Sequence, residues 1–441
     1  MDKTQLDFNR ARLFWIGVLA LFTAAMCFGL RAGLLVAMRE DIYAGAPNPG
    51  ELIGGALGAA FLGNAFSLFF ASPYLDKIGI GNVLRGAAGC FIIGILLTIG
   101  ASFVGDQGLA QNLFWAGFLF QGIGWGSQEA AINPMTTALY PEDKTHRLNV
   151  LHAWWPAGLI AGGLIGFAVG GSSLPWEAAM ATALIPAVAV IVLAVGVAFP
   201  PTEREADGIS MKDMFLEIFR APLFLLWFGA MFLTATVELA PGQWVNAALS
   251  AKVGFNAVLV LVYVASLMFV MRHFAGPLSG RLSNPGLLWV SSLLAMIGLY
   301  MMAQADSAVT VILAATIWGV GVCFMWPTMM ASVAERFPRG GSWFIGLIGS
   351  AGAMAIYFVL PRLGRMYDTA MAKYAGGETA LDALKSAGTP EAAAALTALE
   401  SLAAPEAFEF VAMLPLALLV IFGGIWITDR LRKTKQTGPV E

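Results

Sequence analysis

The sequence predicts an all-α membrane protein with twelve transmembrane helices arranged in two six-helix halves. Of its 441 residues, 58% are hydrophobic and 12% are charged, and the mean hydropathy is +0.75. A soluble globular protein carries about 25% charged residues, so the charge is too low for a water-facing surface. Twelve apolar segments are each long enough to form the roughly 20-residue helix that crosses a bilayer. A charged linker divides them six and six.

The apolar segments run along the whole chain. Because a polar start of mixed charge precedes a first apolar run of about 26 residues, we expect a retained span and not a cleaved signal. We expect residues 1–199 to form the first half, 200–220 a cytoplasmic linker, and 221–441 the second half, with an extracytoplasmic insertion at 369–404. The expected spans are 13–38, 51–75, 83–104, 112–138, 149–171, 177–199, 221–249, 256–280, 286–304, 308–334, 342–368 and 405–428.

Lysine and arginine are unequally distributed between the two sides of this topology. With the N-terminus inside, seventeen of the 25 lie in cytoplasmic segments and four on the opposite side, and the other four fall within spans. Cytoplasmic loops of membrane proteins carry such an excess. We therefore expect a multi-pass protein of the cell inner (plasma) membrane with both termini in the cytoplasm.

The expected insertion at 369–404 is rich in Ala, Leu and Glu. Strong helix formers follow Pro390, a residue suited to the first turn, so we expect a helix to begin there. The segment is too short and too charged to span the membrane. Two roles remain open: a helical cap over the outer vestibule, and a passive surface insertion.

Composition and motifs argue against several classes of function. The net charge of −3 indicates neither nucleic acid nor an anionic lipid surface as a partner. The three cysteines lie far apart in apolar runs, which predicts neither disulfides nor a zinc site. With no HExxH motif and no Ser/His/Asp arrangement, we expect no enzyme, no metal and no cofactor. We expect a monomer in the lipid bilayer that binds a small-molecule substrate.

One polar stripe stands out in the fourth span. Ionisable groups in the middle of a span are costly and are functional candidates by default. Amides, a carboxylate and an indole on one helix face can bind sugar hydroxyls and stack on a sugar ring. Polar contacts between helices are the alternative role. The stripe, within about 140° of one helix face, consists of Gln121, Trp125, Gln128, Glu129 and Asn133.

A second polar island lies in the seventh span. It contains Glu238, Gln243 and Trp244 around Pro241-Gly242, which we expect to break the helix. Broken helices at membrane depth are tolerated mainly where they line a cavity, so we expect these three side chains to bind substrate. A simple kink is the alternative.

The fifth span carries one candidate side chain and one packing motif. His152 could bind substrate or a proton, or it could be a hydrogen-bonded packing residue, and the pattern does not choose. Gly158, Gly162 and Gly166 recur every four residues, which predicts close packing against another helix.

Two short loops occupy matching positions in the halves, after the second and eighth spans. Asp76-Lys77 lies in the first and Arg281 in the second, each where the chain turns tightly at the cytoplasmic face. Together with Arg272 at the end of the eighth span, we expect Asp76 and Arg281 to act in gating.

Four separated stretches share a pattern with a known family: Gly124–Pro134 with Pro141–Glu142 and Arg147–Asn149, Val237–Asn246, Arg272–Arg281, and Phe324–Thr328. They resemble the fucose/galactose/glucose–proton symporter family of the major facilitator superfamily, typified by the bacterial fucose permease. The stretches come from both halves and follow the family's order, so the resemblance implies the twelve-helix major facilitator fold.

The resemblance implies a proton-coupled monosaccharide symporter that works by alternating access, with Glu129 and Glu238 as proton-coupling candidates. In the family, the counterpart of Glu129 has an aspartate partner in the first span. Here Ala32 stands at that place beside Arg31, and Trp155 replaces an expected asparagine. A uniporter or a Na⁺-coupled carrier of an acidic sugar, nucleoside or organic acid remains open. A drug or lipid exporter is disfavoured by the polar stripe, and a sensor by the short tail.

Arg31 has three possible roles. The expected spans place Arg31 and Glu129 about 14 Å apart in depth at 1.5 Å per residue. A direct ion pair would need shifted boundaries or a broken helix. Otherwise Arg31 is a substrate-facing donor that selects an acidic sugar, or an arginine that extends toward the membrane surface.

Overall fold

The computed structural model describes residues 8–44, 49–170, 172–253 and 258–436. The described chain is helical nearly throughout. The helices are α1 (Arg10–Ile42), α2 (Pro49–Ala71), η2 (Ser72–Tyr74), α3 (Leu75–Ile78), α4 (Ile80–Ala101), α5 (Gln107–Leu139), α6 (Lys144–Gly170), α7 (Trp176–Ala181), α8 (Leu184–Ala194), α9 (Glu203–Ala206), α10 (Met211–Arg220), α11 (Leu223–Val253), α12 (Val258–Arg272), α13 (Ala275–Leu282), α14 (Asn284–Gln304), α15 (Ala308–Val322), α16 (Met325–Arg336), η3 (Pro338–Gly340), α17 (Gly341–Ala375), α18 (Glu378–Ala387) and α19 (Pro390–Gln436).

Each expected span is found as one helix or as consecutive helices. Within the described residues, ten segments are long and apolar enough to cross a membrane, and the pair α12–α13, bent by 65°, makes an eleventh. The twelfth is α5, whose 33 residues exceed the needed length but include the polar stripe. The predicted architecture of twelve transmembrane helices in two six-helix halves is confirmed.

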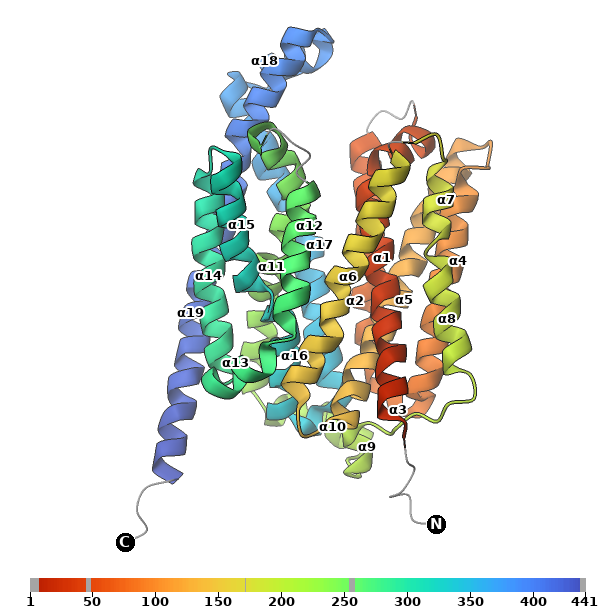
Figure 1. Ribbon diagram of the computed structural model, residues 1–441, viewed down its shortest axis with the longest axis vertical. Helices are drawn as coiled ribbons and strands as arrows, with labels where there is room; N and C mark the ends of the chain where they lie inside the picture. Colours follow the sequence, from red (N-terminus) through yellow and green to blue (C-terminus); the bar gives the residue numbers. More distant parts are fainter. Residues whose placement is uncertain (1–7, 45–48, 171, 254–257, 437–441) are drawn as a thin grey trace. The chain divides into compact units, whose positions relative to one another are not determined.

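The helices pack into two compact units. Unit 1 consists of residues 1–229 and 329–354, and unit 2 of residues 230–328 and 355–441. The last part of α16 and the first part of α17 therefore pack with the first six spans. In unit 1, α3, α9 and α10 lie at the same end, called here the linker end (Figure 1).

Glycines set the closest helix contacts in unit 1. A Cβ on Gly158 of α6 would lie 2.6 Å from the carbonyl oxygen of Phe22 on α1, and one on Gly29 would lie 2.5 Å from that of Leu159. No larger residue fits at such distances. The predicted small-residue face of α6 is thus confirmed, and it holds α1 against α6. Gly63 of α2 fits against α5 in the same way.

The predicted break at Pro241-Gly242 is wrong, because α11 continues as one helix to Val253. Proline has no N–H, so the carbonyl of Val237 one turn earlier loses its helical partner. The indole of Trp318 on α15 donates to that carbonyl at 3.2 Å. A neighbouring helix therefore satisfies the backbone oxygen that the proline leaves unpaired, and the helix need not open.

The insertion forms a helical hairpin with a small core of its own. α17 extends to Ala375, α18 follows, and α19 begins at Pro390 as predicted and runs on to Gln436. Within unit 2, α18 lies at the end opposite α13 (Figure 1). The hairpin core consists of Ala370, Met371, Leu381, Leu399 and Ala403.

Candidate substrate-binding site

The polar stripe of α5 is buried along its whole length. Each of its five side chains is at most 6% exposed. The stripe divides in two, because the amide of Gln121 donates to Thr98 on α4 at 3.0 Å. Of the other four, three form a connected chain of hydrogen bonds.

That chain begins at Trp125 and ends on α6. The indole of Trp125 donates to Oε1 of Glu129 at 2.8 Å, and the amide of Asn133 donates to the backbone carbonyl of Glu129 at 3.0 Å. Nε2 of His152 lies 2.9 Å from Oδ1 of Asn133. Buried side chains from two helices therefore fix the position of Glu129.

Glu129 is fixed but not saturated. An ionised carboxylate has about four acceptor sites, and only one donor reaches its side chain. Among the described residues, Oε2 of Glu129 has no hydrogen-bond partner, nor does Nε2 of Gln128 one position earlier. Unpaired buried polar groups are costly unless something binds them. Within the described residues, Gln128 thus retains an unused donor and Glu129 an unused acceptor.

Four aromatic rings, one from each of α1, α2, α5 and α6, form a cluster that includes Trp125, the donor to Glu129. Trp125 stacks on Trp155 with centroids 4.9 Å apart and planes at 25°, and Phe61 meets Trp125 edge-on at 5.6 Å. Phe28 closes the ring of contacts at 5.9 Å from Trp155 and 6.1 Å from Phe61. We call Phe28, Phe61, Trp125 and Trp155 the aromatic quartet. It joins the four helices around the candidate site.

Arg31 lies beside the quartet without an ionic partner among the described residues. Its guanidinium carbon lies 5.5 Å from the ring centre of Phe28 and 5.2 Å from that of Phe118, within cation–π range. The residue is 5% exposed, and its NH1 has no hydrogen-bond partner in the described part of the chain. Inserting a charged side chain at bilayer depth costs about 2.5–3.5 kcal/mol on translocon scales. Arg31 neither pairs with Glu129 nor extends to the surface.

The candidate acid of unit 2 is placed differently. Glu238 on α11 pairs with Arg272 at the end of α12 at 2.9 Å, with both side chains at most 4% exposed. Its second oxygen accepts the backbone N–H of Trp326 at 3.1 Å, and Arg272 donates to the carbonyl of Cys323 at 2.6 Å. A carboxylate is favourable at a helix N-terminus and a cation at a C-terminus. The pair therefore joins the end of α15 to the start of α16.

The residues expected to act in gating lie in three different settings. Asp76 pairs with Arg204 of the linker, and both side chains are at most 8% exposed. Arg272 belongs to the buried pair with Glu238, and Arg281 on α13 is exposed. The side chains of Gln243 and Trp244, expected to bind substrate, lie outside the part of the structure that is described.

The linker makes further contacts at the linker end of unit 1. Lys144 pairs with Glu203 at 2.8 Å, and Thr145 donates to Glu335 of α16 at 2.8 Å. A Cβ on Gly341, whose φ of +49° favours glycine, would lie 2.8 Å from the Cβ of Arg204. These contacts hold the linker, α16 and α17 together near Asp76.

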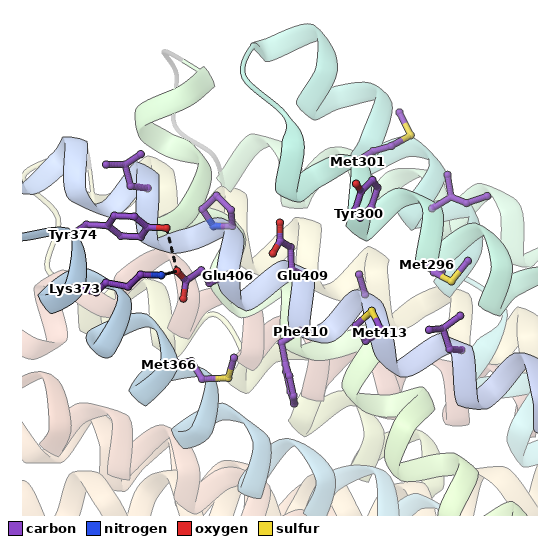
Figure 2. Close-up of a pocket in the computed structure, with 15 residues that line it drawn as sticks. Met296, Tyr300, Met301, Met366, Lys373, Tyr374, Glu406, Glu409, Phe410 and Met413 are labelled. Atoms are coloured by element: carbon purple, nitrogen blue, oxygen red, sulfur yellow. Dashed lines mark hydrogen bonds and ion pairs between the residues drawn. The ribbon is translucent and has the colours of Figure 1, made fainter.

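A separate cavity of about 940 Å³ lies in unit 2, among α14, α17 and α19. Figure 2 shows Lys373 and Tyr374 directed toward Glu406 at one end, where Nζ of Lys373 lies 2.9 Å from the carboxylate. Four methionines contribute to the rest of its lining. None of the residues that the sequence singles out as substrate-binding lines this cavity, so size alone does not locate the candidate site.

Of the four aromatic residues, only Trp125 is predicted from the sequence, through its place on the polar stripe. Trp155 stands out only as a departure from the family pattern, and no pattern marks Phe28 or Phe61. One aromatic residue per helix has no spacing signal, because most such residues pack in cores. The signal that could have found Trp155 is its position between Trp154 and Pro156, one turn from His152.

Comparison with known proteins identifies the fold. No curated protein sequence matches the chain. A solved variant of the E. coli fucose:proton symporter is 15% identical with a TM-score of 0.66, covering 92% of this chain and 98% of its own. The E. coli xylose transporter in a partially occluded inward-open conformation is 11% identical with a TM-score of 0.67, covering 98% and 99%.

A human organic anion transporter has the same fold, at 15% identity and a TM-score of 0.64, covering 94% of this chain and 99% of its own. At such identities these likenesses show the fold alone. The family model described as the Major Facilitator Superfamily matches residues 8–375. With that match over most of its length, the chain belongs to the Major Facilitator Superfamily and is a multi-pass membrane transporter, not an enzyme.

Proposed function

We propose that the protein is a secondary transporter that moves a monosaccharide across the cell inner membrane by proton-coupled alternating access. The observation that carries this proposal is the setting of Glu129. It is buried, fixed by Trp125 and Asn133, and left with one carboxylate oxygen unpaired, among the described residues, beside the aromatic quartet. Such a group can take a proton or a sugar hydroxyl, and the flanking indoles provide a surface for a sugar ring.

The comparisons support the class of transporter, and the identity of the solute has to be inferred from the residues of the site. Two of the similar structures are a fucose:proton and a xylose transporter, and a third is an organic anion transporter. Since one fold hosts several substrates, the choice of a monosaccharide rests on the residues of this chain. Nε2 of Gln128, which has no hydrogen-bond partner among the described residues, favours a ligand with hydroxyl groups.

The orientation we propose follows from the excess of lysine and arginine on one side. With both termini in the cytoplasm, the linker and α10 are cytoplasmic, and α18 with its hairpin is on the outer side. Within unit 1, the contacts of Thr145 with Glu335 and of Arg204 with Gly341 then hold α16 and α17 to the cytoplasmic face. Such contacts would have to open each time the carrier releases solute inward.

The decisive experiment is Glu129→Gln in proteoliposomes, with uptake of radiolabelled fucose, xylose, galactose and the corresponding sugar acids. We expect the variant to lose all accumulation driven by a pH difference alone, because an amide does not take up the proton. Exchange of solute down its own gradient should remain. Glu409→Gln, an acid that lines the lateral cavity of unit 2, is the matched control and should accumulate solute normally.

Accumulation by Glu129→Gln under a pH difference alone would remove Glu129 as the coupling acid. If uptake by the unmodified protein does not depend on the pH difference but depends on a Na⁺ gradient, the coupling ion is Na⁺ and not the proton. If uptake depends on neither gradient, the protein is a uniporter.

The topology is tested separately. A reporter that is active only in the cytoplasm, fused either after residue 441 or within 200–220, should be active in both fusions. Activity of a periplasmic reporter at either position would overturn the proposed orientation while leaving the fold intact.

A further inference from the structure

Arg31 is a buried cation for which the described residues provide no counter-charge. It is 5% exposed, its NH1 has no hydrogen-bond partner in the described part of the chain, and its guanidinium lies over the rings of Phe28 and Phe118. Among the described residues, no carboxylate interacts with its charge. Buried arginines in transmembrane segments usually pair with acids or backbone carbonyls. Within the described residues, Arg31 lacks the anionic partner that such a pair requires.

We propose that the transported solute supplies the missing charge: the substrate is a sugar acid whose carboxylate binds Arg31. This inference rests on the proposed function and names the substrate class of the same site. A guanidinium presents a planar fork that matches a carboxylate in two parallel hydrogen bonds. The carboxylate of the solute replaces the acid that the chain does not provide.

The charge at the site matches a monoanion. Arg31 is a single positive charge, and no second cation acts on it within the described residues. A phosphate monoester carries close to two negative charges and is usually held by several donors or a second cation. One carboxylate is neutralised by one guanidinium, so a carboxylate is the better match.

The position of Arg31 relative to the aromatic quartet defines the rest of the solute. Phe118, which contacts the guanidinium, and Trp125 share a face of α5 seven residues apart, about 10 Å along the helix. A solute held at Arg31 can therefore extend along this face toward Trp125.

The same face places the ring and its hydroxyl groups. Phe28 contacts both the guanidinium and Trp155, so the aromatic quartet lies directly next to the charge of Arg31. One turn beyond Trp125, Gln128 offers a donor and Glu129 an acceptor that the described residues leave unpaired. A solute bound to Arg31 by its carboxylate would lay its ring along the quartet and direct a hydroxyl toward Glu129. Binding of the anion and of the proton would then occur at opposite ends of one site.

The test compares matched neutral and acidic sugars on the purified full-length protein. Thermal unfolding is followed in the presence of galactose against galacturonate and glucose against glucuronate, at fixed ionic strength and fixed chloride. A ligand that binds the folded state raises the apparent unfolding temperature by mass action. We expect the acid of at least one pair to raise it by several degrees and its neutral sugar to give at most a small shift.

Three variants separate a binding role of Arg31 from a structural one. Arg31→Met should abolish the shift with the acid and also raise the unfolding temperature of the ligand-free protein, because it removes an uncompensated buried charge. Arg31→Lys should keep a reduced response to the acid, since the charge remains and the fork is lost. Arg39→Gln, at the exposed end of the same helix, should leave the response unchanged.

A fall in the unfolding temperature of ligand-free Arg31→Met, with the acid response intact, would make Arg31 a packing residue and overturn the inference. A stronger response to the neutral sugars, or a response to chloride alone that requires Arg31, would also overturn it. Glu129→Gln distinguishes the two proposals, because it should lose pH-driven uptake and still prefer the acid. Accumulation of galacturonate by Glu129→Gln under a pH difference would instead defeat the proposed coupling and leave the substrate class standing.

Discussion

Two buried glutamates, one in each unit, are surrounded by opposite kinds of neighbours. Glu238 in unit 2 has an ion pair on one oxygen and a backbone N–H on the other. Glu129 in unit 1 has one indole donor and, within the described chain, an unpaired second oxygen. Both stand out equally in the sequence as acids within spans. Saturation by neighbours, which only the structure reveals, favours Glu238 as a structural group and Glu129 as the one that exchanges partners.

The two arginines differ in the same way. Arg272 is fully engaged by Glu238 and by the end of α15, whereas Arg31 contacts aromatic rings and lacks an acid within the described chain. In unit 2, the charges therefore complete each other and hold a broken helix together. In unit 1, Arg31 and Glu129 do not pair with each other, and we propose that each binds a ligand. The asymmetry favours ligand binding in unit 1 and helix joining in unit 2.

The largest expected effect comes from breaking the buried pair. Glu238→Gln or Arg272→Met should destabilise the protein by about 3–5 kcal/mol, because each leaves one charge buried without its partner. Unfolding temperatures in detergent measure this. The double substitution should recover part of the loss, and Arg281→Gln, the exposed arginine on α13, should change little. A stable Glu238→Gln protein with lost proton coupling would reverse the comparison between the two acids.

A smaller effect is expected at the linker end of unit 1. Asp76→Asn removes the charge that Arg204 pairs with, and we expect a loss of about 1.5–3 kcal/mol, the range for hydrogen bonds to charged groups. Arg204→Gln should show a similar loss, and the double variant should be less than additive. Lys77→Gln, exposed next to Asp76, is the control. Additive losses would show that the two side chains do not stabilise each other.

The fold follows from the sequence because its determinants are local. Length and hydropathy define each span, and the excess of lysine and arginine suggests an orientation. The same is true of Pro390, which starts α19, and of the glycine face of α6. These features depend on residues close together in the chain, so a single sequence contains them.

The site follows only in part, because partners come from distant segments. The stripe on α5 is visible in the sequence, but the diversion of Gln121 to Thr98 is not. The break expected at Pro241 fails for the same reason, since a tryptophan 81 positions beyond Val237 satisfies the freed carbonyl. The pairing of Asp76 with Arg204, 128 residues apart, likewise cannot be predicted from the sequence alone. Each depends on which helices pack together.

The smallest effects should come from a tryptophan in each unit, and they sharpen the comparison most directly. Trp125→Ala removes a ring of the aromatic quartet and the one donor that the described residues provide to the side chain of Glu129. We expect substrate affinity to fall by about tenfold, or 1.4 kcal/mol, the upper part of the range for an aromatic contact. Trp318→Phe removes one hydrogen bond to Val237 and should cost about 1 kcal/mol of stability with affinity unchanged. Isothermal titration of both variants with the sugar that stabilises the unmodified protein, together with their unfolding temperatures, measures both quantities. Unchanged affinity in Trp125→Ala together with lowered stability would show that its indole only packs between helices. Trp125 of unit 1 and Trp318 of unit 2 would then have the same structural role, and the contrast between the units would fail at this position.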